Sequence, residues 1–240
     1  MVSQEERSTG LEEQPDLPSD ERKKISYRFL KGKGIEIGAL HAPLQVRYDV
    51  DVRYVDNFPV ETLIQRYPEL KESKFTPVDI IDDGEFLERI SDNSLDFIIA
   101  NHFLEHCENP LGTLRNHLKK IKPGGILYYS IPEKNLTFDK ERPLTEFDHL
   151  IIDDIRGPSG SRGDHFFEWV QLVDGENDRE MIVEKAKALM DKNYSIHFHV
   201  WDIETIFEFF FRANDYLNKQ FQLLHFEHYG IEVITILQKK

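Results

Sequence analysis

The fold of this chain is decided by the segment GIEIGALHAPL, residues 34–44. Its first residues are mostly apolar, which is typical of a short buried strand, and the strand pattern ends at Gly38. Pro43 follows in the loop and disfavours an immediate helix. The segment therefore predicts a strand that ends in a tight turn, which either faces a ligand or is purely structural.

Similar apolar runs recur along the chain and alternate with stretches of helical spacing. The runs are VRYVD (52–56), VDIID (78–82), LDFIIAN (95–101) and GILYYSIP (125–132), and the helical stretches are 60–67 and 110–121. This alternation predicts a parallel sheet with helices on both faces. FQLLHFEH (221–228) and IEVITILQ (231–238) flank Tyr229-Gly230, which predicts an antiparallel hairpin at the end of the chain.

Four phrases in the sequence resemble those of a known enzyme family. They are Glu36-Ile37-Gly38 with its loop, Tyr54-Val55-Asp56, Leu104-Glu105-His106 and Lys122-Pro123-Gly124-Gly125, the last expected to be a turn before strand five. Together they resemble class I, Rossmann-like, S-adenosylmethionine-dependent methyltransferases, over about residues 30–132 and again at the closing hairpin. The resemblance implies an α/β fold: a seven-stranded, mostly parallel sheet, a C-terminal antiparallel hairpin, and a helical or irregular insertion after strand five. It also implies S-adenosyl-L-methionine as the cofactor, and the subgroup resembled is associated with bacterial surface-polysaccharide biosynthesis.

The loop after the first strand departs from the family pattern in a way that bears on the cofactor. Leu40 and Ala42 stand where the family commonly has two more glycines. A dinucleotide site needs such glycines so that backbone can approach a pyrophosphate at a helix N-terminus. S-adenosyl-L-methionine has no phosphate and tolerates bulkier residues, so a nicotinamide- or flavin-dependent oxidoreductase is disfavoured.

Acidic residues follow successive strands at the sheet edge where α/β proteins bind ligands. Asp56 is expected to accept hydrogen bonds from the ribose hydroxyls, and Asp83-Gly84-Glu85 resembles the family segment that binds adenine. Each aspartate alone fits a turn or helix cap better than a binding role, and it is their occurrence at successive strand ends that indicates a binding site. The predicted cofactor-binding residues are Glu36, Gly38, Ala39, Asp56, Asp82, Asp83, Gly84, Asn101 and His102.

The chain divides into a tail and one domain. Residues 1–24 are acidic and lack hydrophobic periodicity, which indicates a flexible tail. The resemblance implies that residues 25–240 form the methyltransferase domain. Within it, residues 133–220 are predicted as the insertion that covers the acceptor site. Its first part, 133–180, is polar and irregular, and helices follow at about 181–192 and from Ile203, with Asp202 as N-cap of the second.

The insertion also contains the candidate catalytic residues. Methyl transfer to a hydroxyl gains from a general base, and histidine, with an ordinary pKa of about 6.5, suits that role. We predict His165 as the base or acceptor-orienting group, with His197, His199 and Glu168 in or near the same pocket. The two histidines could instead bind a metal with His165 or Glu168, and His165 could merely cap or pack its helix. No metal ligand is assigned.

Composition narrows the function classes further. The formal net charge is −14, which argues against a nucleic-acid partner and mildly favours a neutral or cationic acceptor. Cys107 is the single cysteine and no run is long enough to span a membrane, so we expect a cytoplasmic protein of undetermined oligomeric state. The leading interpretation is methylation of a small molecule or glycan, on a sugar hydroxyl. N-methylation of a small amine and a catalytically silent cofactor-binding partner subunit are the alternatives.

Overall fold

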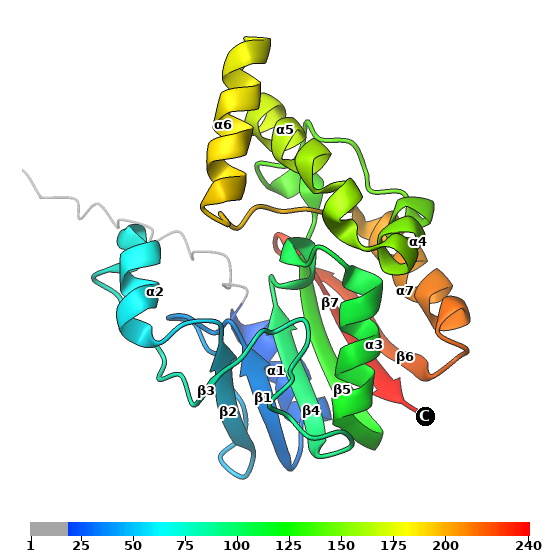
Figure 1. The fold of residues 1–240 in the computed structure, drawn as a ribbon. Coiled ribbons are helices and arrows are strands. Elements are labelled where there is room, and N and C mark those ends of the chain that lie inside the picture. Colours follow the sequence, from blue (N-terminus) through cyan, green and yellow to red (C-terminus); the bar gives the residue numbers. More distant parts are fainter. Residues whose placement is uncertain (1–18) are drawn as a thin grey trace, which may run out of the picture.

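The centre of the fold is a seven-stranded sheet in the order β3-β2-β1-β4-β5-β7-β6 (Figure 1). The computed structural model describes residues 19–240. The parallel strands are β1 (Lys33–Ile37), β2 (Asp51–Asp56), β3 (Ile80–Ile81), β4 (Leu95–Asn101) and β5 (Ile121–Pro132). β7 (Glu232–Lys239) pairs antiparallel with β5 and with β6 (Phe221–Tyr229). The predicted fold class, including the closing hairpin, is confirmed.

Alternating side chains of the strands build two apolar layers. Ile98 and Ala100 of β4 belong to the core on one face, which α3 (Pro110–Lys120), α4 (Phe147–Arg156) and α7 (Ile203–Tyr216) help to build. Phe97 and Ile99 point to the opposite core, which contains Ile25 of α1 (Ser19–Phe29). Because successive strand residues face opposite ways, a strand covered on both faces is apolar throughout.

The parallel register aligns the carboxyl ends of the strands that matter for a ligand. Ile37 of β1 lies opposite Val55 of β2 and Ala100 of β4. The residues that follow these strands therefore meet at one edge of the sheet. No helix separates β1 from β2, as the sequence predicts, and α2 (Val60–Arg66) follows β2.

The insertion after β5 is more regular than predicted. Residues 133–180 were expected to be irregular, but they contain α4 and α5 (Arg162–Leu172) before α6 (Arg179–Asp191). α5 and α6 pack together beyond the carboxyl ends of the strands (Figure 1) and have a small core of their own. Phe166 and Ile196 are fully buried there, so tertiary packing stabilises helices that the polar sequence conceals.

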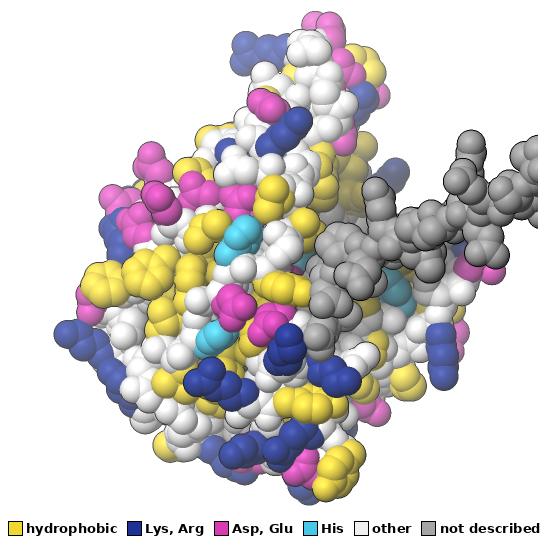
Figure 2. All heavy atoms as spheres, turned by 180° about the vertical axis from the view of Figure 1, so that it is seen from behind, with side chains coloured by type: hydrophobic (Ala, Val, Ile, Leu, Met, Phe, Trp, Pro, Cys, Tyr) yellow, Lys and Arg dark blue, Asp and Glu magenta, His cyan; other side chains and the backbone are white. Residues whose placement is uncertain are grey.

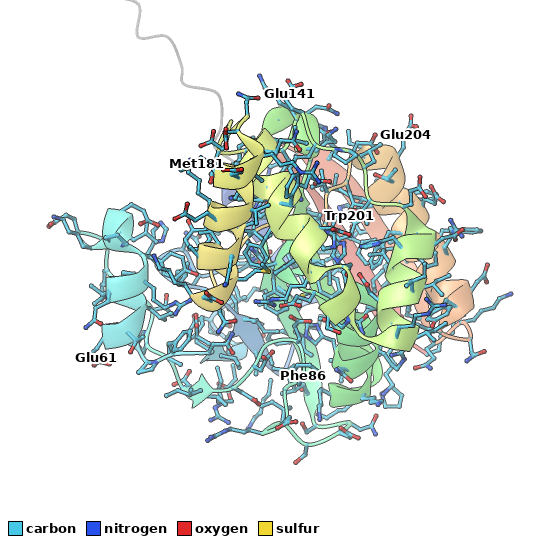
Figure 3. The ribbon with its side chains drawn as sticks, turned by 45° about the horizontal axis from the view of Figure 1, so that its top comes forward. Glu61, Phe86, Glu141, Met181, Trp201 and Glu204 are labelled. Atoms are coloured by element: carbon cyan, nitrogen blue, oxygen red, sulfur yellow. The ribbon has the colours of Figure 1, made fainter. Side chains whose placement is uncertain are left out.

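The segment between α6 and α7 runs through the middle of this layer. Trp201 is buried among the helices of the insertion, whereas Glu61, Met181 and Glu204 lie at the periphery (Figure 3). Asp202 caps α7 in a reciprocal capping box with Thr205, which confirms the predicted N-cap.

Two predicted boundaries need correction. Residues 19–24, assigned to the tail, form the first part of α1, because Arg22 pairs with Glu232 and Ile25 packs against the sheet; residues 1–18 lie outside the described part of the chain. The expected turn at 122–125 is instead included in β5, whose pairing with β4 has an irregularity there, with Gly124 at φ 79°.

Charge is unevenly distributed over the surface. On the face in Figure 2, lysine and arginine side chains gather toward the lower part of the molecule, at the end opposite the α5–α6 pair. This basic area lies away from the carboxyl edge of the sheet. Among residues 19–240, no helix is both long enough and apolar enough to cross a membrane.

Candidate active site at the carboxyl edge of the sheet

A cavity of about 430 Å³ opens at the carboxyl ends of β1, β2 and β4. Its volume falls in the range of small-molecule sites, roughly 300–1,000 Å³. We call it the sheet-edge pocket, and it is lined by Ile37, Gly38, Leu40, Asp56, Asn57, Tyr67, Asp83, Gly84, Glu85, Asn101, His102, Phe103, His106 and Ser195. Six predicted cofactor residues are thus brought together, whereas Glu36, Ala39 and Asp82 are not among the lining residues.

The loop after β1 presents backbone to the pocket. Gly38 has a positive φ of 65°, and a Cβ at this position would meet no atom within 4 Å. Glycine is therefore required by conformation and leaves open space beside the backbone. Glu36 is 1% exposed and accepts hydrogen bonds from the backbone N–H of Leu44 at 2.9 and 3.0 Å. Burial raises its pKa to about 7. Glu36 therefore lies behind the pocket and holds the loop, which the sequence did not indicate.

Asp56 stands at the end of β2 with its side chain at the pocket. Burial raises its pKa to about 6, although hydrogen bonds from the backbone of Phe58 and Asn57 oppose the rise. A partly desolvated carboxylate with few side-chain partners is suited to accept hydrogen bonds from a ligand's hydroxyl groups.

Asp82 and Asp83, which are neighbours in the turn after β3, have different roles. Asp82 accepts from the backbone N–H of Asp83 at 2.9 Å and of Arg89 at 2.7 Å, so it stabilises the turn. Asp83 and Gly84 line the pocket. A Cβ on Gly84 would lie 2.6 Å from Cγ2 of Ile37, so only glycine fits this close approach.

His102 is the most strongly organised polar side chain of the pocket. It has a positive φ of 47°, and its Nε2 lies 2.7 Å from Oε2 of Glu232 on β7. Glu232 is fully buried and is also paired with Arg22 of α1. Burial disfavours the charged forms of both His102 and Glu232. The hydrogen bond to Glu232 nevertheless raises the pKa of His102. The hydrogen bonds from His102 and Arg22 lower the pKa of Glu232 to about 2. Glu232 is therefore ionised in the folded protein, and its carboxylate favours the protonated form of His102.

Neither Arg22 nor Glu232 is a predicted site residue. Glu232 is a charged residue at the start of the closing strand, directly before the apolar Val233 and Ile234, and this is the sequence signal that could have marked it as buried. Arg22 carries no such signal, because its segment reads as a solvated tail.

His106 lines the sheet-edge pocket from the segment after β4. Burial lowers its pKa to about 3, so the ring is neutral. Its Nδ1 lies 2.9 Å from the carbonyl oxygen of Ile196 and therefore carries the proton. The ring meets that of His197 edge-on, with centroids 4.6 Å apart.

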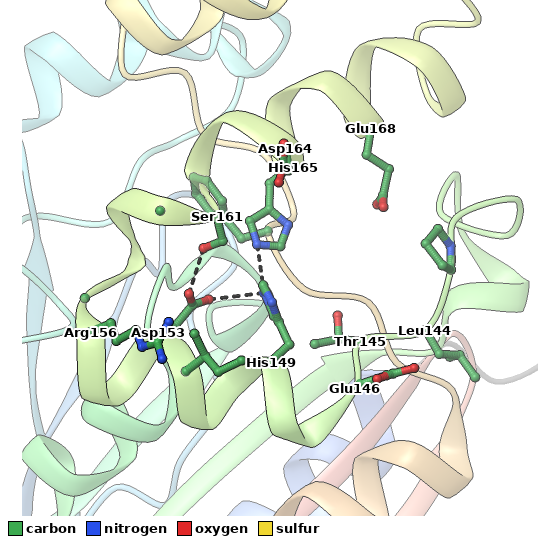
Figure 4. A pocket seen from close by; sticks show the side chains of 15 residues that line it. Leu144, Thr145, Glu146, His149, Asp153, Arg156, Ser161, Asp164, His165 and Glu168 are labelled. Carbon is green, nitrogen blue, oxygen red and sulfur yellow. Dashed lines mark hydrogen bonds and ion pairs between the residues drawn. The ribbon is translucent and has the colours of Figure 1, made fainter.

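The predicted catalytic histidines fall into two groups. His165 lines a second cavity of about 590 Å³ between α4 and α5, as does Glu168 (Figure 4), and its ring lies 5.1 Å from that of His199. His197 instead pairs with Asp139 at 2.6 Å and contacts His106. Glu168 and His199 therefore lie in or near the pocket of His165, as predicted, whereas the ring of His197 belongs to a different cluster, with His106.

The family to which the chain belongs follows from comparison with known proteins. The model of a family described as a methyltransferase domain matches residues 25–214. The chain belongs to this family, and it is an S-adenosyl-L-methionine-dependent methyltransferase with a Rossmann-like fold. No curated protein matches its sequence significantly.

Solved structures share the fold at low sequence identity. A Rhodobacter sphaeroides protein named as a Zn-dependent alcohol dehydrogenase has a TM-score of 0.53 at 14% identity, over 93% of this chain and 91% of its own. A structure from Haloferax volcanii, of the Trm112 methyltransferase activator with a methyltransferase, has a TM-score of 0.51 at 11% identity, over 92% and 89%. A protein assigned as an S-adenosyl-L-methionine-dependent methyltransferase from Methanococcus maripaludis has a TM-score of 0.48 at 17% identity, over 93% and 84%. The chain spans 49% of a longer carbon methyltransferase.

The sheet-edge pocket fits the cofactor by its own chemistry. Asn101 lines it, and Oδ1 of this residue is buried without a hydrogen-bond partner, so it is available to a ligand N–H. Asp56 offers a carboxylate at the same edge, and the turn at Gly84 brings backbone close to the cavity. Asp56, Gly84 and Asn101 would therefore hold S-adenosyl-L-methionine here.

Proposed function

We propose that this methyltransferase acts on a hydroxyl group of a small molecule or glycan and that His102 is its general base. The observation that carries the proposal is the His102–Glu232 pair beside the sheet-edge pocket. Nε2 of His102 donates to Glu232, so Nδ1, which lies 3.6 Å from Oε1 of the buried Glu105, is the nitrogen left to accept a proton. A buried carboxylate partner increases the basicity of the ring, which favours proton removal from a hydroxyl group.

The chemistry assigns a separate task to each residue of this network. S-adenosyl-L-methionine supplies a methyl group carried on a positively charged sulfur. Nδ1 of His102 would take the proton from the acceptor hydroxyl group, which makes its oxygen the nucleophile toward that methyl group. Glu232 stabilises the imidazolium that forms, and Arg22 keeps Glu232 ionised.

His165, His197 and His199 stay predicted catalytic residues, but His102 is favoured over them. His102 lines the pocket that fits the cofactor, and none of the three does. Burial also lowers the pKa of His165 to about 4, which makes it a weaker base near neutral pH.

A sugar hydroxyl in surface-polysaccharide biosynthesis is the acceptor that we propose. Support comes from the resemblance of the Glu36-Ile37-Gly38 loop and the Leu104-Glu105-His106 phrase to that subgroup. The net charge of −14 favours a neutral or cationic acceptor over a polyanion. The same charge also favours the second candidate, N-methylation of a small amine.

The test compares acceptors and variants in one assay. Full-length protein with S-adenosyl-L-methionine is incubated with neutral mono- and oligosaccharides and, separately, with small primary amines, and methylated products are detected by mass spectrometry. His102→Gln should lower turnover by about 100-fold or more while the cofactor affinity, measured by calorimetry, stays within a few-fold. In the wild type, the rate should rise with pH as His102 loses its proton.

Three matched outcomes decide between the interpretations. The exposed His228→Gln is the control and should keep turnover, and His165→Gln, which tests the competing base, should lose less turnover than His102→Gln. Loss of turnover in His165→Gln with normal turnover in His102→Gln would overturn the assignment of the base. Products from amines alone would replace the hydroxyl acceptor, and cofactor binding without any product would favour a silent partner subunit.

A further inference from the structure

Four side chains of metal-ligand type meet beside the cavity between α4 and α5, and three of them, His149, Asp153 and His165, line it (Figure 4). His149 and Asp153 stand one turn apart on α4, His165 comes from α5, and His199 from the segment before α7. One ligand atom of each residue lies within 4.8 Å of the other three. Three separate elements of the insertion thus direct nitrogen or oxygen atoms at a common point.

The distances between these ligand atoms are close to those between neighbouring ligands in a tetrahedral metal site. Nε2 of His149 lies 3.1 Å from Nε2 of His165 and 3.1 Å from Oδ2 of Asp153. Zinc–nitrogen bonds of about 2.0–2.1 Å at tetrahedral angles place two ligand atoms roughly 3.3 Å apart. Small side-chain movements would therefore complete the shell.

Two of the four ligand atoms are buried without a hydrogen-bond partner. They are Oδ2 of Asp153 and Nδ1 of His199. The ion-pair distance from His149 to Oδ2 of Asp153 is short, but the atoms are not aligned as a hydrogen bond. A buried polar atom without a partner costs free energy, roughly 1–3 kcal/mol, so a bound cation would satisfy both at once.

Outer contacts already hold two ligands in a binding orientation. Ser161 donates from Oγ to Oδ1 of Asp153 at 2.8 Å, which leaves Oδ2 facing the cluster. Nε2 of His199 lies 3.5 Å from the carbonyl oxygen of Glu108, which favours a proton on Nε2 and a free lone pair on Nδ1. Hydrogen bonds of this kind to the ligand side chains are the usual means by which proteins orient metal ligands.

We propose that His149, Asp153, His165 and His199 bind one divalent transition-metal ion, with Zn²⁺ as the best fit. Three imidazoles and one carboxylate match this class, whereas Mg²⁺ and Ca²⁺ prefer oxygen ligands throughout. Four protein ligands complete a tetrahedron, which is the arrangement of a structural site.

This site would join α4 and α5 to the segment that follows α6. That segment also carries Ser195, which lines the sheet-edge pocket, and Ile196, whose carbonyl oxygen holds His106. The ion therefore fixes one wall of the pocket without touching the reacting groups. Metal binding at this site is independent of the nature of the acceptor and of His102 as the base.

The competing interpretation is a histidine cluster held together by hydrogen bonds alone. In that case His149 and His165 share one proton between their Nε2 atoms, and added metal binds no more tightly than to other surface histidines. The two interpretations differ in metal content, in affinity and in the response to conservative variants.

The experiment uses the full chain without a histidine tag. Metal is removed with a chelator, and Zn²⁺ and Co²⁺ are titrated by calorimetry, with Co²⁺ also followed by its visible absorption. We expect one equivalent per chain, tetrahedral-type Co²⁺ bands, and a higher melting temperature on binding.

Graded variants separate ligands from neighbours. His199→Ala and Asp153→Asn should each weaken Zn²⁺ affinity by more than about 100-fold, and Ser161→Ala by about 10–100-fold, as is typical of an outer contact. Asp153→Asn keeps an oxygen for the Ser161 hydroxyl group, so it tests the proposal even if His199→Ala does not fold. His228→Ala is the matched control and should leave affinity unchanged. Equal Zn²⁺ affinity in the wild type and Asp153→Asn, or octahedral Co²⁺ bands, would overturn the proposal.

Discussion

Replacing Glu232 by glutamine removes one negative charge from the centre of the Arg22–Glu232–His102 network. The pKa of Glu232 is about 2 compared with an ordinary 4.5, because its hydrogen bonds from His102 and Arg22 outweigh the opposing effect of burial. At 1.36 kcal/mol per pKa unit, this ionised group stabilises the folded state by about 3 kcal/mol at neutral pH. The variant also leaves Arg22 without its negatively charged partner, so the free energy of unfolding should fall by about 3–5 kcal/mol.

The effect should depend on pH in a defined direction. The pKa of Glu232 is lowered by folding, so its contribution is complete above about pH 4.5 and is lost as pH falls toward 2. The pKa of His102 is raised from 6.5, so its contribution is complete below that value and is lost as pH rises through the folded pKa. The difference between wild type and variant should therefore be largest between about pH 4.5 and 6.5.

Urea unfolding followed by circular dichroism measures this difference, at about pH 3, 5.5 and 8. Glu227→Gln on the neighbouring strand is the matched control, because its ion pair with His225 is partly exposed and should contribute less than about 1 kcal/mol. A destabilisation by Glu232→Gln that equals that of the control, or that is the same at about pH 3 and 5.5, would refute the reasoning.

Three further predictions follow from single contacts. Asp56→Asn should weaken S-adenosyl-L-methionine binding by about 1.5–3 kcal/mol. It should also remove the pH dependence of binding that comes from this group, because the wild-type carboxyl group, with a pKa of about 6, becomes protonated at lower pH and then binds the cofactor less well. Calorimetry at two pH values checks both effects, and unchanged affinity would leave Asp56 as a turn residue. Gly84→Ala should lower stability by about 1–3 kcal/mol through the 2.6 Å approach to Ile37, whereas Gly160→Ala, which meets open space, should not; equal unfolding midpoints would contradict this. Asp202→Ala removes the capping box of α7 and should cost about 1 kcal/mol in urea unfolding without changing cofactor affinity; a loss of affinity would show a role beyond the cap.

Local patterns in the sequence were sufficient to predict the sheet and part of the site. The apolar run before Gly38 predicts β1, the Tyr229-Gly230 turn predicts the closing hairpin, and Asp202 predicts the start of α7. Asp56 and Asn101 could be placed at one edge because parallel strands align their carboxyl ends. Each of these inferences needs only neighbouring residues and the strand direction.

Roles that depend on distant contacts could not be predicted in this way. Asp82 and Asp83 are adjacent in sequence, yet one holds the turn and the other lines the pocket. His197 and His199 have the same residue type and similar neighbours, but their rings belong to different clusters. Side-chain direction in an irregular segment is set by what packs against it, and sequence spacing does not specify that.

The sequence by itself therefore determined the α/β class, the strand pattern and the acidic edge of the sheet, because these follow from local periodicity and chain direction. Only the tertiary structure decided that Arg22 meets Glu232, 210 positions away, beside His102. It alone also brought His149, His165 and His199 from three elements to one point. The physical reason is that long-range pairings are fixed by the order of strands in the sheet and by the packing of helices on it, and no short stretch of residues encodes that order.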